Sequence, residues 1–94
     1  MRTPREDLKD LMEHTCWVTD MEDPNTSSQQ LDLGMLEIVI VRFRENKKVS
    51  YGYTVSNTVT GATLMLSVNI DKKNLLDDLS KALEALGIPM DAYR

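Results

Sequence analysis

The fold is decided by residues 35–70, which read MLEIVIVRFRENKKVSYGYTVSNTVTGATLMLSVNI. Three apolar or alternating runs are separated here by two short polar turns, a pattern typical of β-strands. The runs predict strands at 35–44, 48–56 and 62–70. Because the turns are only a few residues long, neighbouring strands must run antiparallel. This part of the chain is therefore predicted to form a three-stranded antiparallel sheet.

A helix is predicted on each side of these strands. Thr3 can cap the first helix, which extends over residues 3–15. Asp71 can cap the second, over residues 72–86, whose stripe of leucines ends before Gly87. The order α-β-β-β-α predicts an α+β fold in which both helices pack on one face of the sheet.

The bulk composition is that of a small globular protein. With 94 residues and a mass of 10.7 kDa, the chain is predicted to form a single domain over residues 1–94. Hydrophobic residues make up 41% and charged residues 28%, which excludes a wholly disordered chain. Residues 20–34 are mostly polar and include Pro24, so we expect a flexible loop there.

Cysteine content and hydropathy indicate the compartment. The only cysteine, Cys16, cannot form an intramolecular disulfide, which favours a reducing environment. The N-terminus has no apolar segment of the kind found in secretory signals. The longest apolar run, Leu36–Phe43, is much shorter than the roughly 20 residues that span a bilayer. We therefore expect a cytoplasmic protein with no membrane contact.

The first predicted strand is apolar on both faces, unlike a strand with one solvated side. One face carries Leu36, Ile38 and Ile40, the other carries Val39, Val41 and Phe43, and either set can lie under the helices. The other two strands are expected to contribute six residues to the covered face: Tyr51, Tyr53, Val55, Leu64, Leu66 and Val68.

If the first set is covered, the opposite face of the sheet is open and partly apolar. Such a surface is typical of an interaction site. The alternative is that the loop at 20–34 folds over it. We expect a non-enzymatic protein–protein interaction module, forming a homodimer or binding another protein, such as a bacterial or phage regulator or inhibitor. The predicted partner-binding residues are Val39, Val41, Phe43 and Met65, with Arg42 and Arg44 steering the partner.

Nucleic-acid binding is the alternative function. The chain has a net charge of −4, whereas proteins that bind phosphates are usually basic. Residues 35–56 differ from the rest, since they carry four basic and two acidic side chains. The cations that would contact phosphates are Arg42, Arg44, Lys47, Lys48, Lys72 and Lys73. The other interpretation of the basic hairpin is a solvated tip whose charges protect a sheet edge.

The order α-β-β-β-α resembles that of the double-stranded-RNA-binding domain over most of the chain. That family contacts the duplex with its first helix, the loop between its first two strands, and lysines at the start of its second helix. The resemblance therefore implies a role for Lys72 and Lys73, although Asn74, Leu75 and Leu76 depart from the family's lysine-rich pattern.

A second resemblance concerns Tyr51-Gly52-Tyr53, which is similar to the centre of the RNA-recognition submotif whose aromatic residues stack on bases. Val49 and Ser50 stand where that submotif has a basic residue and a glycine. The alternative interpretation is that both tyrosines belong to the core.

Residues with catalytic or metal-binding chemistry are sparse. His14 is the only histidine, so no histidine pair can hold a metal. His14 and Cys16 are two positions apart, a spacing that does not bring side chains together on a helix. The glycine-rich phosphate-binding motifs and the nucleophile elbow are also missing from the sequence. We expect no enzymatic activity, no metal and no cofactor.

Overall fold

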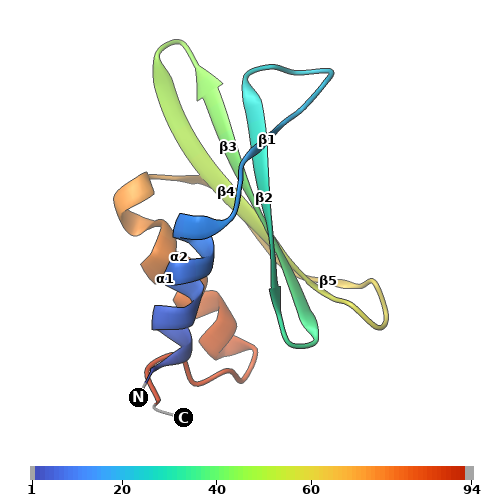
Figure 1. Ribbon diagram of the computed structural model, residues 1–94, viewed down its shortest axis with the longest axis vertical. Helices are drawn as coiled ribbons and strands as arrows, with labels where there is room; N and C mark the ends of the chain where they lie inside the picture. The colour runs from blue at the N-terminus through green and yellow to red at the C-terminus, as the bar shows by residue number, and fades with distance from the viewer. Residues whose placement is uncertain (1, 93–94) are drawn as a thin grey trace.

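The computed structural model describes residues 2–92, and within them the chain forms two helices and five strands (Figure 1). Their order is α1 (Pro4–His14), β1 (Val18–Thr19), β2 (Thr26–Leu33), β3 (Leu36–Glu45), β4 (Lys48–Asn57), β5 (Thr63–Ile70) and α2 (Lys72–Ala85). Each strand pairs antiparallel with the next, so the sheet follows the order of the chain. The prediction of an α+β fold with an antiparallel sheet is confirmed.

The predicted number of strands is wrong. β1 and β2 extend the sheet beyond β3, and β2 occupies residues 26–33 of the segment that we expected to be a loop at 20–34. That segment joins the edge of the sheet and does not fold over its face. The order is α-β-β-β-β-β-α, so the topological resemblance to the double-stranded-RNA-binding domain does not hold.

The inward positions of β2 explain why the sequence pattern did not reveal it. Ser27, Gln29 and Leu31 point toward the helices and are buried, but two of these three residues are polar. The apolar alternation that marks a half-buried strand is therefore missing. Gln29 is only 1% exposed, and its Nε2 donates to the carbonyl oxygens of Met12 and Thr15, both at 2.7 Å.

These two hydrogen bonds complete the end of α1. The last carbonyl groups of a helix have no intrahelical donor, and a buried helix end needs a partner for them. Gln29 supplies two donors from the neighbouring strand, while its own Oε1 has no partner. The polar residue is inside because it satisfies the backbone of another element.

The register of β3 decides which of its two apolar faces is covered. Ile38 lies opposite Val55 and Ile40 opposite Tyr53, and these side chains face the helices. Both isoleucines are completely buried. The first of the two orientations left open by the sequence is therefore correct, and Val39 and its alternating neighbours point to the opposite side.

The helix boundaries match the prediction within one residue. The predicted N-terminal cap of α2 is not formed, because Asp71 lies at the N-cap position but its side chain makes no hydrogen bond to the helix. Thr3 Oγ1 accepts from the backbone N–H of Glu6 at 3.2 Å, as expected for a capping box. At the end of α2, Gly87 has a φ of +94°, a conformation that favours glycine. The N–H of Ile88 then donates to the carbonyl of Leu83 at 3.0 Å, which closes a Schellman motif.

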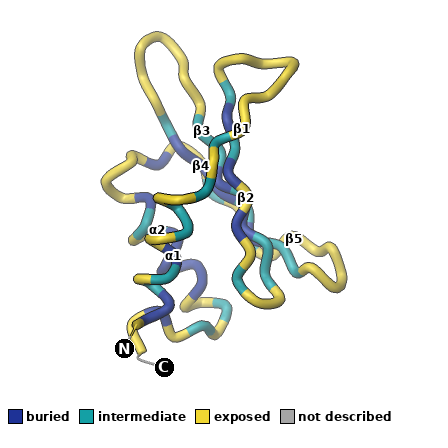
Figure 2. Tube along the Cα trace, in the orientation of Figure 1, coloured by how far each residue is buried: buried dark blue, intermediate teal, exposed yellow. Residues whose placement is uncertain are grey.

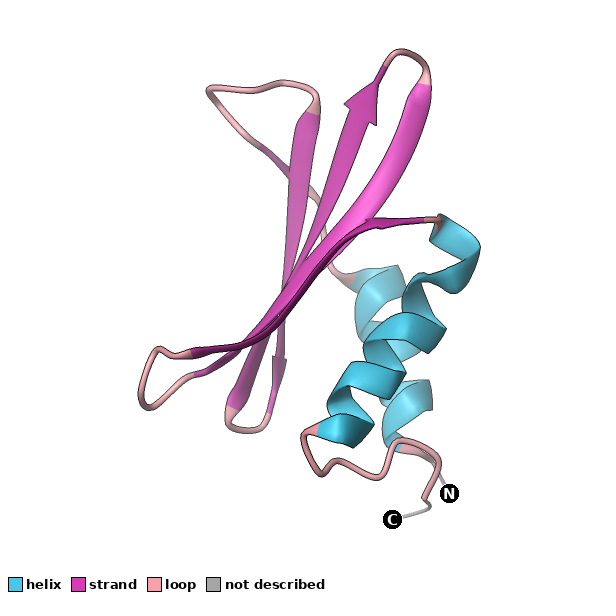
Figure 3. Ribbon diagram, turned by 180° about the vertical axis from the view of Figure 1, so that it is seen from behind, coloured by secondary structure: helices cyan, strands magenta, loops and turns pink. Residues whose placement is uncertain are grey.

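Both helices lie on one side of the sheet, as predicted (Figure 3). The buried residues lie between the helices and the middle of the sheet, whereas the hairpin ends are exposed (Figure 2). Arg5 joins α1 to α2 through an ion pair with Asp77 at 2.7 Å, and to the segment after α2 through an ion pair with Asp91 at 2.8 Å. The core is thus complete on the helix side.

Tyr53 links β4 to α2, and its ionisation makes the free energy of unfolding depend on pH in the alkaline range. Its hydroxyl donates to Oδ1 of Asp78 at 2.8 Å. Burial, reinforced by the Asp78 carboxylate, raises the pKa of Tyr53 to about 12. The unfolded phenol ionises at about 10, so the unfolded state loses its proton first as pH rises. The free energy of unfolding is therefore expected to fall by about 2–3 kcal/mol between pH 10 and pH 12.

Urea unfolding at a series of alkaline pH values measures this dependence. The matched variant is Tyr53→Phe, which keeps the ring and removes the ionisable group. It should lose about 1 kcal/mol near neutral pH, because one hydrogen bond is gone, and its stability should fall less steeply above pH 10. Equal slopes for the wild type and the variant would contradict the assignment.

Candidate functional site

The sheet face opposite the helices has no covering element among residues 2–92 (Figure 3). Apolar side chains from two strands lie on it, three from β3 and two from β5. We call Val39, Val41, Phe43, Leu66 and Val68 the open-face patch. Leu66 is 69% exposed and Val68 is 54% exposed. Large apolar side chains exposed to this degree on one face are typical of an interaction surface.

The structure corrects the predicted orientation of β5. Strict alternation places Leu64, Leu66, Val68 and Ile70 on one face, and we expected the first three under the helices. Only Ile70 is buried, at 6% exposure, whereas the other three are well exposed. The open face is therefore more apolar than the sequence indicated.

A β-bulge near the end of β5 is the reason. Ser67 pairs with Tyr53, but Ile70 pairs with Tyr51, so two residues of β5 lie opposite one residue of β4. One of the two is Asn69, whose φ is +60°. The extra residue interrupts the alternation and turns Ile70 back into the core. No apolar pattern marks this bulge in advance, so the sequence analysis missed the contribution of β5 to the open face.

The predicted partner-binding residues divide between the two sides of the sheet. Three of them, on β3, lie on the open face as expected. Met65 does not, because it pairs with Val55 and packs against the core. Arg42 lies on the helix side, where its guanidinium carbon is 4.6 Å from the ring centroid of Trp17. Alternation places Arg44 on that side too, so neither arginine lies beside the open-face patch.

A furrow runs along the open-face patch at Gly52. A Cβ at this position would lie 2.8 Å from the carbonyl oxygen of Ser67 and 3.2 Å from Cγ1 of Val68. Only glycine therefore fits between β4 and the bulged part of β5. The missing side chain leaves a hollow of about 90 Å³ between the β3 and β5 parts of the patch. The open face thus has two apolar ridges with a depression between them.

The six cations of the alternative function are distributed over several parts of the chain. Lys47 and Lys48 lie at the turn between β3 and β4, and Lys72 and Lys73 begin α2. Arg42 and Lys72 line one hollow on the helix side. Arg44 and the two turn lysines lie further along the hairpin and do not line that hollow. The structure therefore joins two of these six cations at a common site.

The two tyrosines of the RNA-recognition resemblance belong to the core. Tyr51 is 7% exposed and Tyr53 is 3% exposed, and both face the helices. Base stacking needs an accessible aromatic face, so neither ring can serve as a stacking platform. The core interpretation is confirmed.

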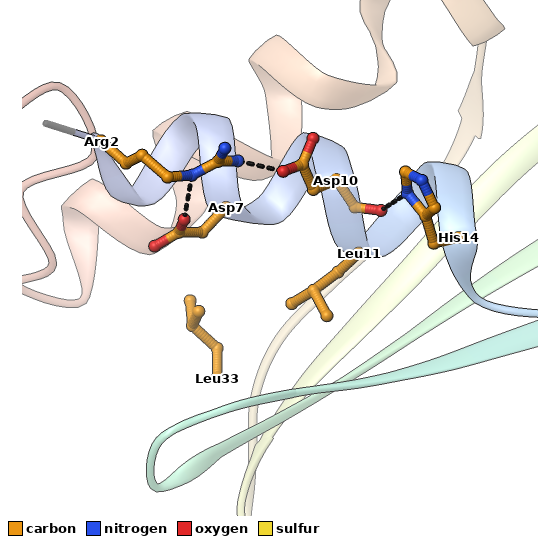
Figure 4. A pocket seen from close by; sticks show the side chains of 6 residues that line it. All are labelled: Arg2, Asp7, Asp10, Leu11, His14 and Leu33. Atoms are coloured by element: carbon orange, nitrogen blue, oxygen red, sulfur yellow. Dashed lines mark hydrogen bonds and ion pairs between the residues drawn. The ribbon is translucent and has the colours of Figure 1, made fainter.

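A wider hollow of about 580 Å³ lies between α1 and the end of β2 (Figure 4). Leu11 and Leu33 form its apolar part. Arg2 forms ion pairs with both Asp7 and Asp10, so the carboxylates here are already neutralised by a neighbouring guanidinium. His14 Nδ1 donates to the carbonyl oxygen of Asp10 at 2.8 Å. Since its charges are satisfied internally, this hollow is a weak candidate for an ionic ligand.

The part of the chain that the structure describes shows neither a metal site nor a membrane-spanning helix. Over residues 2–92, no group of three His, Cys, Asp or Glu side chains is placed to hold a metal ion. None of the helices in this same range is long and apolar enough to cross a membrane. Comparisons of the chain with protein-family models, with curated proteins and with solved structures found no match.

Proposed function

We propose that this chain is a protein–protein interaction module that acts through its open face, and that a second copy of the chain occupies this face. The observation that supports the proposal is the open-face patch itself. The core on the helix side is closed without these side chains, and Phe43, Leu66 and Val68 remain exposed in the single chain. Burial against a partner removes this surface from water, which is the main favourable term in association.

The shape of the patch favours a second copy as the partner. In a two-fold dimer the same surface contacts itself, so the surface must be self-complementary. In the proposed dimer, the ridge formed by Leu66 and Val68 would lie in the furrow beside Gly52 of the other copy, and the reverse contact would form at the same time. Two sheets pack face to face at about 10 Å when their side chains interdigitate in this way.

The charges around the patch are compatible with self-association. Each chain carries a net charge of −4, so two copies repel unless the contact surface is neutral. The patch and the β4 residues between its ridges, which are Ser50, Gly52 and Thr54, contain no ionisable side chain. Acidic residues on this face lie beyond the ends of the patch, Asp32 and Glu37 at one end and Glu45, opposite Lys48, at the other. The centre of the proposed interface is therefore free of like-charge repulsion.

The variant Leu66→Glu tests this proposal. Its side chain is exposed in the single chain, so the fold should tolerate glutamate, whereas a two-fold interface would bury two carboxylates at its centre. We expect the dissociation constant of the dimer to rise by at least about 100-fold, because a buried unpaired charge is costly. Size-exclusion chromatography with light scattering, run over a dilution series, distinguishes a dimer from a chain of 10.7 kDa.

The matched control is Val59→Glu, which makes the same charge change at a 73% exposed position between β4 and β5, outside the patch. It should dimerise like the wild type. A wild-type chain that remains monomeric at its highest soluble concentration would overturn the second copy as the occupant. Equal dimerisation of Leu66→Glu and Val59→Glu would exclude the open face as the interface.

A further inference from the structure

A second hollow, independent of the open face, lies where the two helices meet the sheet. It has a volume of about 360 Å³ and combines an apolar floor with a charged rim. Tyr51 and Leu75 belong to its floor, and both are buried. Lys9, Arg42 and Lys72 belong to its rim. We call this site the cationic hollow.

Ordinary helix periodicity brings these side chains together. Lys9 and Met12 are three positions apart on α1, and so are Lys72 and Leu75 on α2, so each pair lies on one helix face. Each helix therefore contributes one cation and at least one apolar side chain, and α1 also contributes Glu13. On the sheet side of the hollow, Arg42 of β3 lies opposite Tyr51 of β4, so the sheet also contributes a cation beside an apolar ring.

The three cations have no carboxylate partner among the residues that the structure describes. Ion pairs in that range involve Arg2 and Arg5, both near the start of α1. Glu13 is the one acidic residue that lines the cationic hollow, and it forms no ion pair with Lys9. A chain with a net charge of −4 thus gathers an excess of positive charge at one concave site.

Arg42 is held in place by aromatic contacts. Its guanidinium lies 4.6 Å from the centroid of the Trp17 ring, within the range of a cation–π interaction. Trp17 in turn meets Tyr51 edge to face, with centroids 6.2 Å apart. Because the stacked arginine is already ordered, an anion that binds it loses less side-chain entropy. Arg42 has no ion-pair partner among residues 2–92 that would compete with an anion.

The start of α2 adds to the positive potential. Its N-cap residue, Asp71, makes no side-chain hydrogen bond to the helix, and the first turn contains no acidic residue. The unsatisfied N–H groups and the dipole at such a terminus favour an anion. This contribution acts in the same direction as Lys72, which begins the helix, whereas the carboxylate of Asp71 at the N-cap acts against both.

We infer that the cationic hollow binds a small organic anion in which a carboxylate or phosphate is joined to a flat, apolar body. The anionic group lies among Lys9, Arg42 and Lys72, and the apolar body packs against the half-buried Met12, Trp17 and Leu76. The volume is at the lower end of the range for small-molecule sites, about 300–1,000 Å³, so the ligand has one or two rings.

The probe for the first test is the aromatic anion anilinonaphthalene sulfonate, compared with N-phenyl-naphthylamine, which has the same rings and no charge. Trp17 is the only tryptophan of the chain, so energy transfer from its indole reports that the probe is bound to the chain, and the charge variants below locate the site. We expect the anion to bind at least about fivefold more tightly than the neutral compound, and its affinity to fall as salt is added. Equal affinities would overturn the inference.

Charge variants locate the bound anion. Lys72→Gln and Arg42→Gln should each weaken binding about fivefold, whereas Lys48→Gln, the same change at the hairpin turn, should leave it unchanged. Lys72 is exposed, so its variant folds even if Arg42→Gln disturbs Trp17. If Lys72→Gln and Lys48→Gln bind the probe equally, the site is not the cationic hollow.

Competition then distinguishes the two anionic groups. Phenyl phosphate and benzoate, added separately, should each displace the probe, and the tighter competitor identifies the preferred group. Failure of both to displace it would overturn the inference. Leu66→Glu on the open face should leave the Trp17 signal intact, so this result is independent of whether the chain dimerises.

Discussion

Replacing Gln29 with glutamate is expected to lower the free energy of unfolding by about 3–5 kcal/mol at neutral pH. The amide Nε2 now donates to the carbonyl oxygens of Met12 and Thr15 at 2.7 Å. A carboxylate there would place a charged acceptor against two acceptors, in a position that is 1% exposed. The end of α1 would lose its donors, and an unpaired charge would be buried.

The same substitution predicts a pH dependence. A buried carboxyl group without a donor has a raised pKa in the folded state. The stability of the Gln29→Glu variant is therefore greatest below the unfolded pKa of about 4.3 and is lost as the pH rises above it. Urea unfolding of the wild type and the variant near pH 4 and pH 7 should show the difference growing with pH.

Two further variants separate charge from shape. Gln30→Glu makes the same change one residue away, at an exposed position on the other face of β2, and should change stability by less than about 0.5 kcal/mol. Gln29→Met removes the donors together with the unpaired Oε1, so it should cost about 1–3 kcal/mol, less than glutamate. If Gln29→Glu is as stable as Gln30→Glu, the proposed cap of α1 is wrong.

Gln29 also shows why part of the fold could not be predicted. Local signals sufficed for the helices, because their caps lie within a few residues, as Thr3 and Gly87 do. They sufficed for β3 and β4, where the apolar alternation is strong. β2 is buried through a polar residue whose partners are 14 and 17 positions away. No local pattern encodes such a contact.

In the candidate sites, too, local sequence patterns predict one part, and the other part depends on the tertiary structure. The β3 half of the open-face patch was predictable, since Val39, Val41 and Phe43 alternate with the core isoleucines. The β5 half depends on a bulge that reverses the direction of Ile70 relative to Val68. The cationic hollow joins four separate segments of the chain. In the sequence, its only signal is that a cation and an apolar residue stand three positions apart on each helix. That spacing is common on helix surfaces, so it becomes informative only with the tertiary structure.

Gly52→Ala is expected to lower the free energy of unfolding by about 2–3 kcal/mol, although it adds a single methyl group. The backbone at Gly52 has no positive φ, so the cost comes from contact and not from conformation. The new Cβ would lie 2.8 Å from the carbonyl oxygen of Ser67, which is backbone and cannot rotate away. β5 must therefore move outward, which it can do because it is the edge strand, and its hydrogen bonds to β4 weaken.

Gly61→Ala provides the contrasting control. Gly61 has a φ of +74° and nothing within 4 Å of a Cβ, so alanine there is strained in conformation but meets no neighbour. It should cost about 1 kcal/mol. Hydrogen exchange separates the two causes: Gly52→Ala should speed the exchange of the β5 amides of Thr63–Ile70, whereas Gly61→Ala should leave most of them protected.

Because the same methyl group also fills the furrow of the open-face patch, Gly52→Ala should weaken dimerisation even where the chain remains folded. A variant with wild-type β5 exchange and wild-type dimerisation would show that the close approach of β4 and β5 shapes neither the sheet edge nor the interface.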